Sequence, residues 1–246
     1  MKYLLIFLIT LYTVPVSGQT PEEFFNSGKL KYENNDYKGA ISDFDKAVEL
    51  KTTNADVYIL RGNSKLKSGD QKSALKDYSN AIEMNPSARA YHNRGIIKKD
   101  QEDYDEAVKD FSKAIELDPL YTSSYETRGM ILLLIKNDYQ NAIKDFDELI
   151  KIDPKDAEFF NLRGMAKGKG SDINGGIADF TNAISIDSSN SEYYYNRARL
   201  KLKIKDDNGA CQDFNEAIEM GHEISDQSVV SFMKGCLNGR TYIITD

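Results

Sequence analysis

One short phrase occurs six times in this chain at nearly constant spacing, and this repeat limits the possible folds more than any other feature. Its clearest copies are AVKDFSKAIELDP at 107–119 and AIKDFDELIKIDP at 142–154. The intervals between successive copies are 34, 33, 35, 34 and 34, because the copies begin at residues 40, 74, 107, 142, 176 and 210. A fixed period of this size is typical of repeat architectures, in which each repeat packs only against its neighbours.

Each repeat has the apolar spacing of two short helices. In the second half of the third repeat, apolar side chains recur at i, i+1, i+4, i+7 and i+8, at Ala107, Val108, Phe111, Ala114 and Ile115. This spacing places them on one face of an α-helix. The polar segment KDQEDY separates this helix from an earlier one that begins near Tyr91, and Pro119 prevents it from continuing. We therefore expect two antiparallel helices per repeat, which bury their apolar faces by stacking on neighbouring repeats.

Three positions recur in phase in all six repeats. An aromatic residue lies near the start of each first helix, at Phe24, Tyr58, Tyr91, Tyr125, Phe160 and Tyr194. A small residue follows it, at Gly28, Gly62, Gly95, Gly129, Gly164 and Ala198. A second aromatic lies in each second helix, at Phe44, Tyr78, Phe111, Phe146, Phe180 and Phe214. In these residues the chain resembles the tetratricopeptide-repeat (TPR) family, although the family's closing proline is present only as Pro86, Pro119 and Pro154.

The resemblance implies an all-α fold, a right-handed α-α superhelix (TPR solenoid) of six helix-turn-helix repeats with a capping helix. The repeats fill residues 19–224, at about 21–54, 55–87, 88–121, 122–156, 157–190 and 191–224. We expect residues 225–246 to form the capping helix and a mobile tail. The recurring aromatics lie on the packed helical face, so we interpret them as core rather than as a ladder for stacking a ligand.

Residues 1–18 have the layout of a secretory signal peptide. Lys2 gives a positive start, Tyr3 to Tyr12 form a short apolar run, and Pro15 interrupts the run before a cleavage site ahead of Gln19. The apolar run is shorter than a bilayer-spanning helix, which argues against the alternative of a membrane anchor. We therefore expect a periplasmic or secreted protein with no membrane span after cleavage.

Composition and motifs argue against nucleic-acid binding and against catalysis. The formal net charge is −7 with scattered Lys and Arg, whereas nucleic-acid binding needs concentrated positive charge. The two histidines, His92 and His222, lie in different repeats without a recurring Cys or carboxylate partner. The GMAKGKGS segment at 164–171 is one residue short of the spacing in a phosphate-binding loop. We expect no catalytic residues, no cofactor and no metal site.

A charged pair also recurs along the chain. An arginine precedes the small residue in repeats two to six, at Arg61, Arg94, Arg128, Arg163 and Arg197, while the first repeat has Ser27 there. An aspartate precedes the second aromatic in every repeat, at Asp43, Asp77, Asp110, Asp145, Asp179 and Asp213. Because only the first arginine is missing, we predict that each arginine pairs with the aspartate of the preceding repeat. The predicted pairs are Arg61–Asp43, Arg94–Asp77, Arg128–Asp110, Arg163–Asp145 and Arg197–Asp179.

The two cysteines lie near the C-terminal end of the array. Cys211 occupies an apolar position of the sixth repeat, which by itself is typical of a small buried side chain. Cys236 lies on SDQSVVSFMKGC, which we predict to be the helix that covers the last repeat. Because export would place both thiols in an oxidising compartment, we predict a Cys211–Cys236 disulfide.

Resemblance to TPR proteins implies a noncatalytic scaffold that binds an extended peptide or a partner helix in a concave groove lined by first helices. The alternative is a structural subunit that assembles an envelope complex through its convex face or array ends. Some co-chaperone relatives clamp a terminal carboxylate with Lys and Asn, but no three successive repeats from one to four hold that complete set. The oligomeric state is left open, and the expected partner is a protein or peptide.

The fourth repeat suggests where such a partner binds. Its GMILLLIK segment at 129–136 is apolar around nearly the whole helix, whereas an amphipathic helix has a polar face. In the family register, the groove residues would be His92, Asn93, Ile96, Glu126, Met130, Leu133, Leu134, Asn161, Leu162 and Met165. The competing interpretation is that the one-residue-longer interval here turns these side chains into extra core packing.

Overall fold

The computed structural model describes residues 20–236, which divide into two compact segments at residue 86. In the first segment the helices are α1 (Pro21–Glu33), α2 (Tyr37–Glu49), α3 (Ala55–Lys67) and α4 (Gln71–Met84). The second begins with α5 (Ala88–Asp100), α6 (Tyr104–Leu117), α7 (Thr122–Ile131), the π-helical segment η1 (Leu132–Lys136) and α8 (Tyr139–Ile152). It continues with α9 (Ala157–Lys169), α10 (Ile173–Ile186), α11 (Ser191–Lys203), α12 (Asp207–Glu219) and α13 (Gln227–Cys236). The predicted signal peptide and tail lie outside the described residues.

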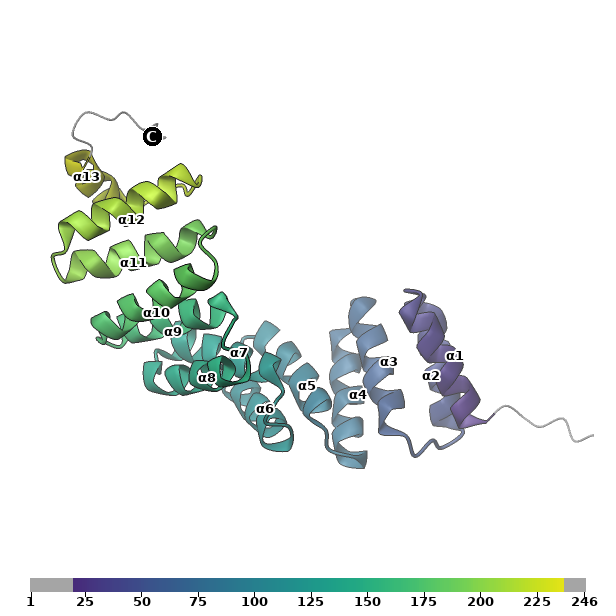
Figure 1. The fold of residues 1–246 in the computed structure, drawn as a ribbon. Coiled ribbons are helices and arrows are strands. Elements are labelled where there is room, and N and C mark those ends of the chain that lie inside the picture. The colour runs from purple at the N-terminus through teal and green to yellow at the C-terminus, as the bar shows by residue number, and fades with distance from the viewer. Residues whose placement is uncertain (1–19, 237–246) are drawn as a thin grey trace, which may run out of the picture. The chain divides into compact units, whose positions relative to one another are not determined.

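Consecutive helices pair as six hairpins, from α1–α2 to α11–α12, and each repeat of the sequence supplies one hairpin (Figure 1). The described residues contain no β-strand. Within each compact segment, the second helix of one hairpin also packs against the first helix of the next, as α8 does against α9. The all-α class of stacked helical hairpins is thus confirmed. None of the described helices is long and apolar enough to cross a bilayer.

The turn inside each hairpin has a recurring two-residue structure. Its first residue has a left-handed backbone, at Asn35, Gly69, Glu102, Asn137, Ser171 and Lys205. The next residue is an aspartate that caps the second helix, and in five of the six turns its carboxylate accepts a hydrogen bond from a backbone N–H of the first helical turn. Such a cap satisfies an otherwise unpaired helix N–H and stabilises the helix by about 1 kcal/mol. The turns therefore fix where every second helix begins.

The recurring small residue lets the two helices of a hairpin approach closely. A Cβ at Gly62 would lie 2.8 Å from the ring of Tyr78, and one at Gly129 would lie 2.7 Å from the ring of Phe146. Both rings are fully buried. The small residue and the second aromatic therefore form one packing contact inside each hairpin, and the aromatic is core as predicted.

The arginines pair differently from the prediction. Each one holds the aspartate of its own repeat with two hydrogen bonds, and the pairs are Arg61–Asp77, Arg94–Asp110, Arg128–Asp145, Arg163–Asp179 and Arg197–Asp213. The bonds in the last pair measure 2.8 and 2.7 Å. Each guanidinium also lies over the first-helix aromatic three residues before it, at 5.3–5.9 Å from the ring centroid. The predicted pairing with the preceding repeat's aspartate is therefore wrong.

A different contact reaches the preceding repeat. The remaining guanidinium nitrogen of Arg61, Nη1, donates to Asp45 at 2.8 Å, and Nη1 of Arg163 donates to Asp147 at 2.7 Å. Arg128 and Arg197 use the same nitrogen on hydroxyls, those of Ser112 and Thr181. The first repeat has no predecessor to reach, and its buried aspartate is held by other groups. The absence of the first arginine was thus a sign of an inter-repeat contact, but the contact involves the residue two positions after the aspartate.

The 35-residue interval is absorbed at the end of the first helix in the fourth repeat. Arg128 and Asp145 are 17 residues apart, whereas the paired residues of the other repeats are 16 apart. The extra residue lies where α7 continues into η1, and a π-helical turn accommodates one more residue than an α-helical turn. The turn ends at Asn137, whose backbone is left-handed. The insertion therefore changes the face of the helix on which η1 side chains lie.

The last helix covers the end of the array as expected. In α13, Val229 and Met233 are buried against Phe214 of α12. The sulfur atoms of Cys211 and Cys236 are at disulfide distance, 1.95 Å. The chain thus places the predicted cysteine pair across the contact between α12 and its cap.

Candidate functional site

The ten predicted groove residues do not form one surface. Glu126 and Leu134 are exposed, while three residues are buried, namely Leu133, Asn161 and Leu162. The remaining five are half-buried, and they are His92, Asn93, Ile96, Met130 and Met165. Only the exposed and half-buried residues can contact a partner directly.

Leu133 is core. It is fully buried in a cluster with Tyr125, Phe146 and Leu149, and Leu162 of the next repeat belongs to the same cluster. The π-helical turn rotates Leu133 away from the face that the family register assigns to it. For this residue the structure therefore matches the core interpretation, and placing Leu133 on the groove surface was a wrong expectation.

Asn161 is buried because it belongs to a polar network between α9 and α11. Its amide donates to Glu158 at 3.1 Å and accepts from Asn196 at 3.3 Å. The hydroxyl of Tyr193 donates to the other oxygen of Glu158 at 3.3 Å. Burial raises the pKa of Glu158 above its ordinary value, and burial together with this carboxylate raises the pKa of Tyr193 to about 12. Asn161 thus joins two repeats and offers little surface.

His92 also joins two repeats. Its Nδ1 lies 2.9 Å from the hydroxyl of Ser124 at the start of α7, and its ring lies between those of Phe111 and Tyr121. Burial lowers the pKa of His92 to about 4, so the ring is neutral near pH 7. A neutral, half-buried ring of this kind packs α5 against α7 and is poorly suited to contact a charged partner.

The surface residues of the fourth repeat line an apolar hollow of about 400 Å³. Met130 and Leu134 lie in its wall together with Ile135, which the prediction omitted. The side chains of Leu134 and Ile135 are 45% and 47% exposed, so this end of the repeat presents an apolar patch to solvent. Lys99 and Asp100 at the end of α5 form the polar part of the rim.

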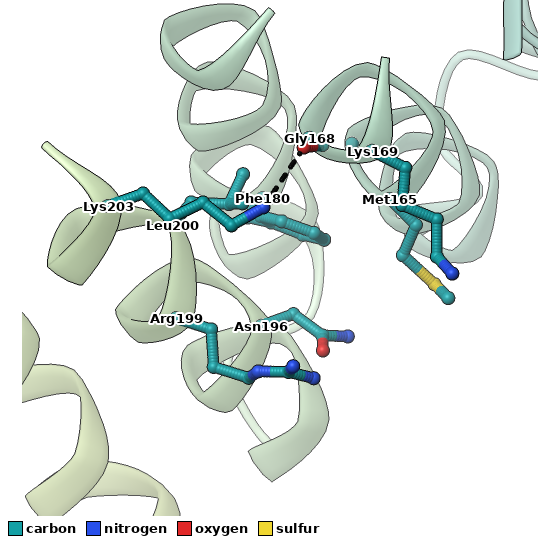
Figure 2. A pocket seen from close by; sticks show the side chains of 9 residues that line it. Met165, Gly168, Lys169, Phe180, Asn196, Arg199, Leu200 and Lys203 are labelled. Atoms are coloured by element: carbon teal, nitrogen blue, oxygen red, sulfur yellow. Dashed lines mark hydrogen bonds between the residues drawn. The ribbon is translucent and has the colours of Figure 1, made fainter. Parts of the chain in front are cut away.

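A second pocket lies between the first helices of the fifth and sixth repeats and encloses about 120 Å³ (Figure 2). Figure 2 shows Met165 and Lys169 extending from α9, and Asn196 and Arg199 extending from α11. Lys203 crosses the pocket and donates to the backbone carbonyl of Gly168 at 3.2 Å. The pocket thus combines an apolar wall with three cationic side chains in a chain of net charge −7.

These cations were missed by the sequence reasoning, which followed apolar residues through the register. A signal was nevertheless present. Arg199 follows the small residue of its first helix, which is the position of Met130 and Met165 in the fourth and fifth repeats. That position is apolar in the third to fifth repeats and becomes cationic at the sixth, whereas the first two repeats have Lys29 and Asn63 there. In the described residues, no cluster of His, Cys, Asp or Glu has the geometry to hold a metal ion.

Comparison with known proteins gives the family of the repeats. Two models, both described as tetratricopeptide repeat, match the chain. One matches residues 88–121, and the other matches residues 24–54, 55–87, 122–156 and 191–220. No protein of curated function matches the sequence at a significant level.

Solved structures with a similar fold include YrrB, described as a TPR protein with an unusual peptide-binding site. It is 21% identical with a TM-score of 0.68, and the match covers 78% of this chain and 97% of YrrB. MamA from Desulfovibrio magneticus RS-1 is 22% identical with a TM-score of 0.62, over 68% of this chain and 94% of that one. A tetratricopeptide repeat protein from Parabacteroides merdae is 17% identical with a TM-score of 0.63, over 90% of this chain and 100% of that one. At these identities the likeness shows the fold alone.

Proposed function

The chain belongs to the tetratricopeptide-repeat family, and we propose that it is a noncatalytic scaffold that binds an extended segment of a partner protein. The family and the fold support a role in protein interaction, and one structural neighbour is described as having a peptide-binding site. We place the binding surface on the first helices of the fifth and sixth repeats. A fold does not select a partner, so the chemistry of this surface must do so.

The observation that carries the proposal is the pocket between α9 and α11. Met165 gives it an adaptable apolar wall, since an unbranched thioether side chain fits irregular shapes. Lys169 and Arg199 are exposed beside that wall, and Asn196 adds an amide. A partner segment with a carboxylate next to an apolar side chain would satisfy both kinds of group. We therefore propose that the bound segment is acidic and apolar.

The proposal can be tested with fluorescent peptides of one apolar pattern that carry Glu, Gln or Lys at the remaining positions. Fluorescence anisotropy should show the tightest binding for the Glu peptide and weaker binding at higher salt. The double variant Met165→Glu/Arg199→Glu should bind the Glu peptide at least about tenfold more weakly, because it removes one cation and adds like charge.

The matched control is Lys113→Glu/Lys151→Gln, which makes the same total change in net charge on exposed second-helix side chains. Its binding should equal that of the wild type. If all three peptides bind equally, the charged pocket has no role in selection. If only the control variant loses binding, the function lies on the second helices, as in the alternative of a structural subunit of an envelope complex.

We also propose that the protein is exported through cleavage of residues 1–18. The layout of that segment supports this, and so does the cysteine pair at disulfide distance, since disulfides persist in oxidising compartments. Mass spectrometry of the protein from a periplasmic fraction should give a chain that begins at Gln19. A full-length chain that fractionates with the membrane would instead support the membrane-anchor alternative.

A further inference from the structure

A lysine recurs four residues after the arginine position in five of the six repeats. In each of these repeats the lysine ammonium lies 2.6–2.9 Å from Oδ2 of the aspartate that precedes the second aromatic. The lysines are Lys31, Lys65, Lys98, Lys167 and Lys201. The fourth repeat has Leu132 at this position. The array therefore builds the same ammonium–carboxylate contact five times and omits it once.

The carboxylate that lacks its lysine is buried. Asp145 is 3% exposed and accepts bonds of 3.0 and 2.6 Å from Nε and Nη2 of Arg128. No lysine of the described residues lies within ion-pair distance of Asp145. The nearby Lys144 is exposed and donates to the side-chain oxygen of Asn141 at 3.1 Å. Oδ2 of Asp145 thus accepts one hydrogen bond, from Nε of Arg128. In the other five repeats, the equivalent oxygen also contacts the lysine ammonium.

The pKa values of Asp145 and of the first repeat's aspartate are shifted in opposite directions. Burial raises the pKa of Asp145, and the hydrogen bonds from Arg128 only partly oppose this effect. In the first repeat, burial also acts to raise the pKa of Asp43, but hydrogen bonds from Lys31 and Ser27 outweigh it and the pKa is lowered. An added ammonium at Asp145 would stabilise its ionised form in the same way.

The structure has room for this group. A cavity of about 350 Å³ lies beside Asp145, between α6, the end of the first helix and α8. Val108 and Leu132 supply apolar surface to it, and Ser112 and Asn141 supply polar atoms. Lys144 also lines the cavity, but its ammonium is bonded to Asn141 and not to Asp145. The cavity thus offers an apolar path for the four methylene groups of a lysine and a carboxylate oxygen, Oδ2 of Asp145, for its ammonium.

We propose that this cavity binds the side chain of a lysine from a partner protein, whose ammonium contacts Oδ2 of Asp145. The incoming group takes the place that the repeat's own lysine fills elsewhere in the array. The site is lined mainly by second helices and η1, so it is separate from the pocket between α9 and α11. A partner can therefore use it whether or not that pocket binds an acidic segment.

The test follows the carboxyl carbon of each aspartate by NMR in ¹³C-labelled protein, during titration with n-butylammonium chloride. Asp145 should show a saturable change of chemical shift, while Asp179, which has Lys167, should not respond. Sodium chloride at the same ionic strength should leave both signals in place. An Asp145 signal that does not saturate, or that responds equally to sodium chloride, would overturn the proposal.

Two variants exchange the roles of the repeats. Leu132→Lys supplies the missing ammonium from the chain itself and should weaken the response of Asp145 at least about tenfold. Lys167→Leu removes the ammonium in the fifth repeat and should make Asp179 respond. If Leu132→Lys does not fold, the wild-type titration and Lys167→Leu still decide, and a silent Asp145 in the wild type would refute the site.

The source of the ammonium is tested with two further probes, the peptide acetyl-Gly-Lys-Gly-amide and free 1,4-diaminobutane. Tighter binding of the peptide supports a lysine in a partner protein. Equal or tighter binding of the diamine would overturn that assignment and identify the cavity as a site for a free amine.

Discussion

Replacing Leu133 by alanine should lower the free energy of unfolding by about 3 kcal/mol, in the middle of the range for buried leucines. The side chain is fully buried among Tyr125, Phe146 and Leu149, so the truncation leaves a cavity in the core shared by the fourth and fifth repeats. The neighbouring Leu134 is 45% exposed, and its replacement by alanine should cost about 1 kcal/mol or less because half of the side chain is already in water.

Urea denaturation followed by far-UV circular dichroism measures both variants. With a slope of about 2–3 kcal/mol per molar urea, Leu133→Ala should move the midpoint by about 1 M and Leu134→Ala by much less. Equal shifts for the two variants would refute the assignment of Leu133 to the core. So would a Leu133→Ala protein that unfolds at the wild-type midpoint but loses peptide binding, since that result is expected for a surface residue.

Three other results follow from the structure. A double-mutant cycle on Arg197 and Asp213 should give a coupling energy of about 1–3 kcal/mol, whereas a cycle on Arg197 and Asp179 should give about zero. The reverse result would restore the rejected pairing. Because the pKa of His92 is about 4 in the folded protein and about 6.5 when unfolded, the unfolded chain binds more protons between these values. The stability that neutral His92 contributes is therefore complete above about pH 6.5 and is lost as the pH falls toward 4. Urea denaturation over this pH range should show a smaller loss of stability in acid for His92→Asn than for the wild type. An identical pH profile for the two proteins would contradict the shift. Replacing Cys211 and Cys236 by serine should cost about 3 kcal/mol for a loop closed over a separation of 25 residues, and dithiothreitol should destabilise the wild type but leave the serine variant unchanged.

The core was predictable from the sequence because its contacts are local. The second-helix aromatic and the first-helix small residue recur in phase, as Phe146 and Gly129 do. Helical spacing places each on the packed face of its own helix, and the two meet where the helices of the hairpin pair. The capping helix was predictable for a similar reason, since Val229 and Met233 have the spacing of an apolar face that needs a neighbour.

The choice of arginine partner was not predictable in this way. Aspartates of the same repeat and of the preceding repeat lie at similar separations along the chain, so the rotation of the helices decides between them. Pairing within each repeat leaves Asp43 of the first repeat without an arginine, and this gap favoured the preceding repeat as the source of the partner. Ser27 and Lys31 instead donate to it at 2.6 Å each, and this substitution is visible only once the side chains are placed.

The groove residues predicted in the fourth repeat were placed wrongly in part because one inserted residue changes the helical phase. An additional residue rotates the following side chains by about 100° in an α-helix, which is enough to exchange a surface position for a core position. Leu133 became core while Ile135 became exposed. The sequence indicated an insertion between the third and fourth copies of the phrase, but it did not show that η1 would absorb it.

The left-handed turn residues show that the array is less stable than its fold permits. Asn35, Asn137 and Gly69 suit this conformation, whereas Glu102, Ser171 and Lys205 adopt it at a cost of about 1 kcal/mol each. None of these last three residues lines the pockets described above. An engineer could therefore place asparagine or glycine at all three and gain thermal tolerance without altering a binding surface. The same positions also matter for evolution. Stabilising changes at them can offset destabilising substitutions that alter which partner the protein binds.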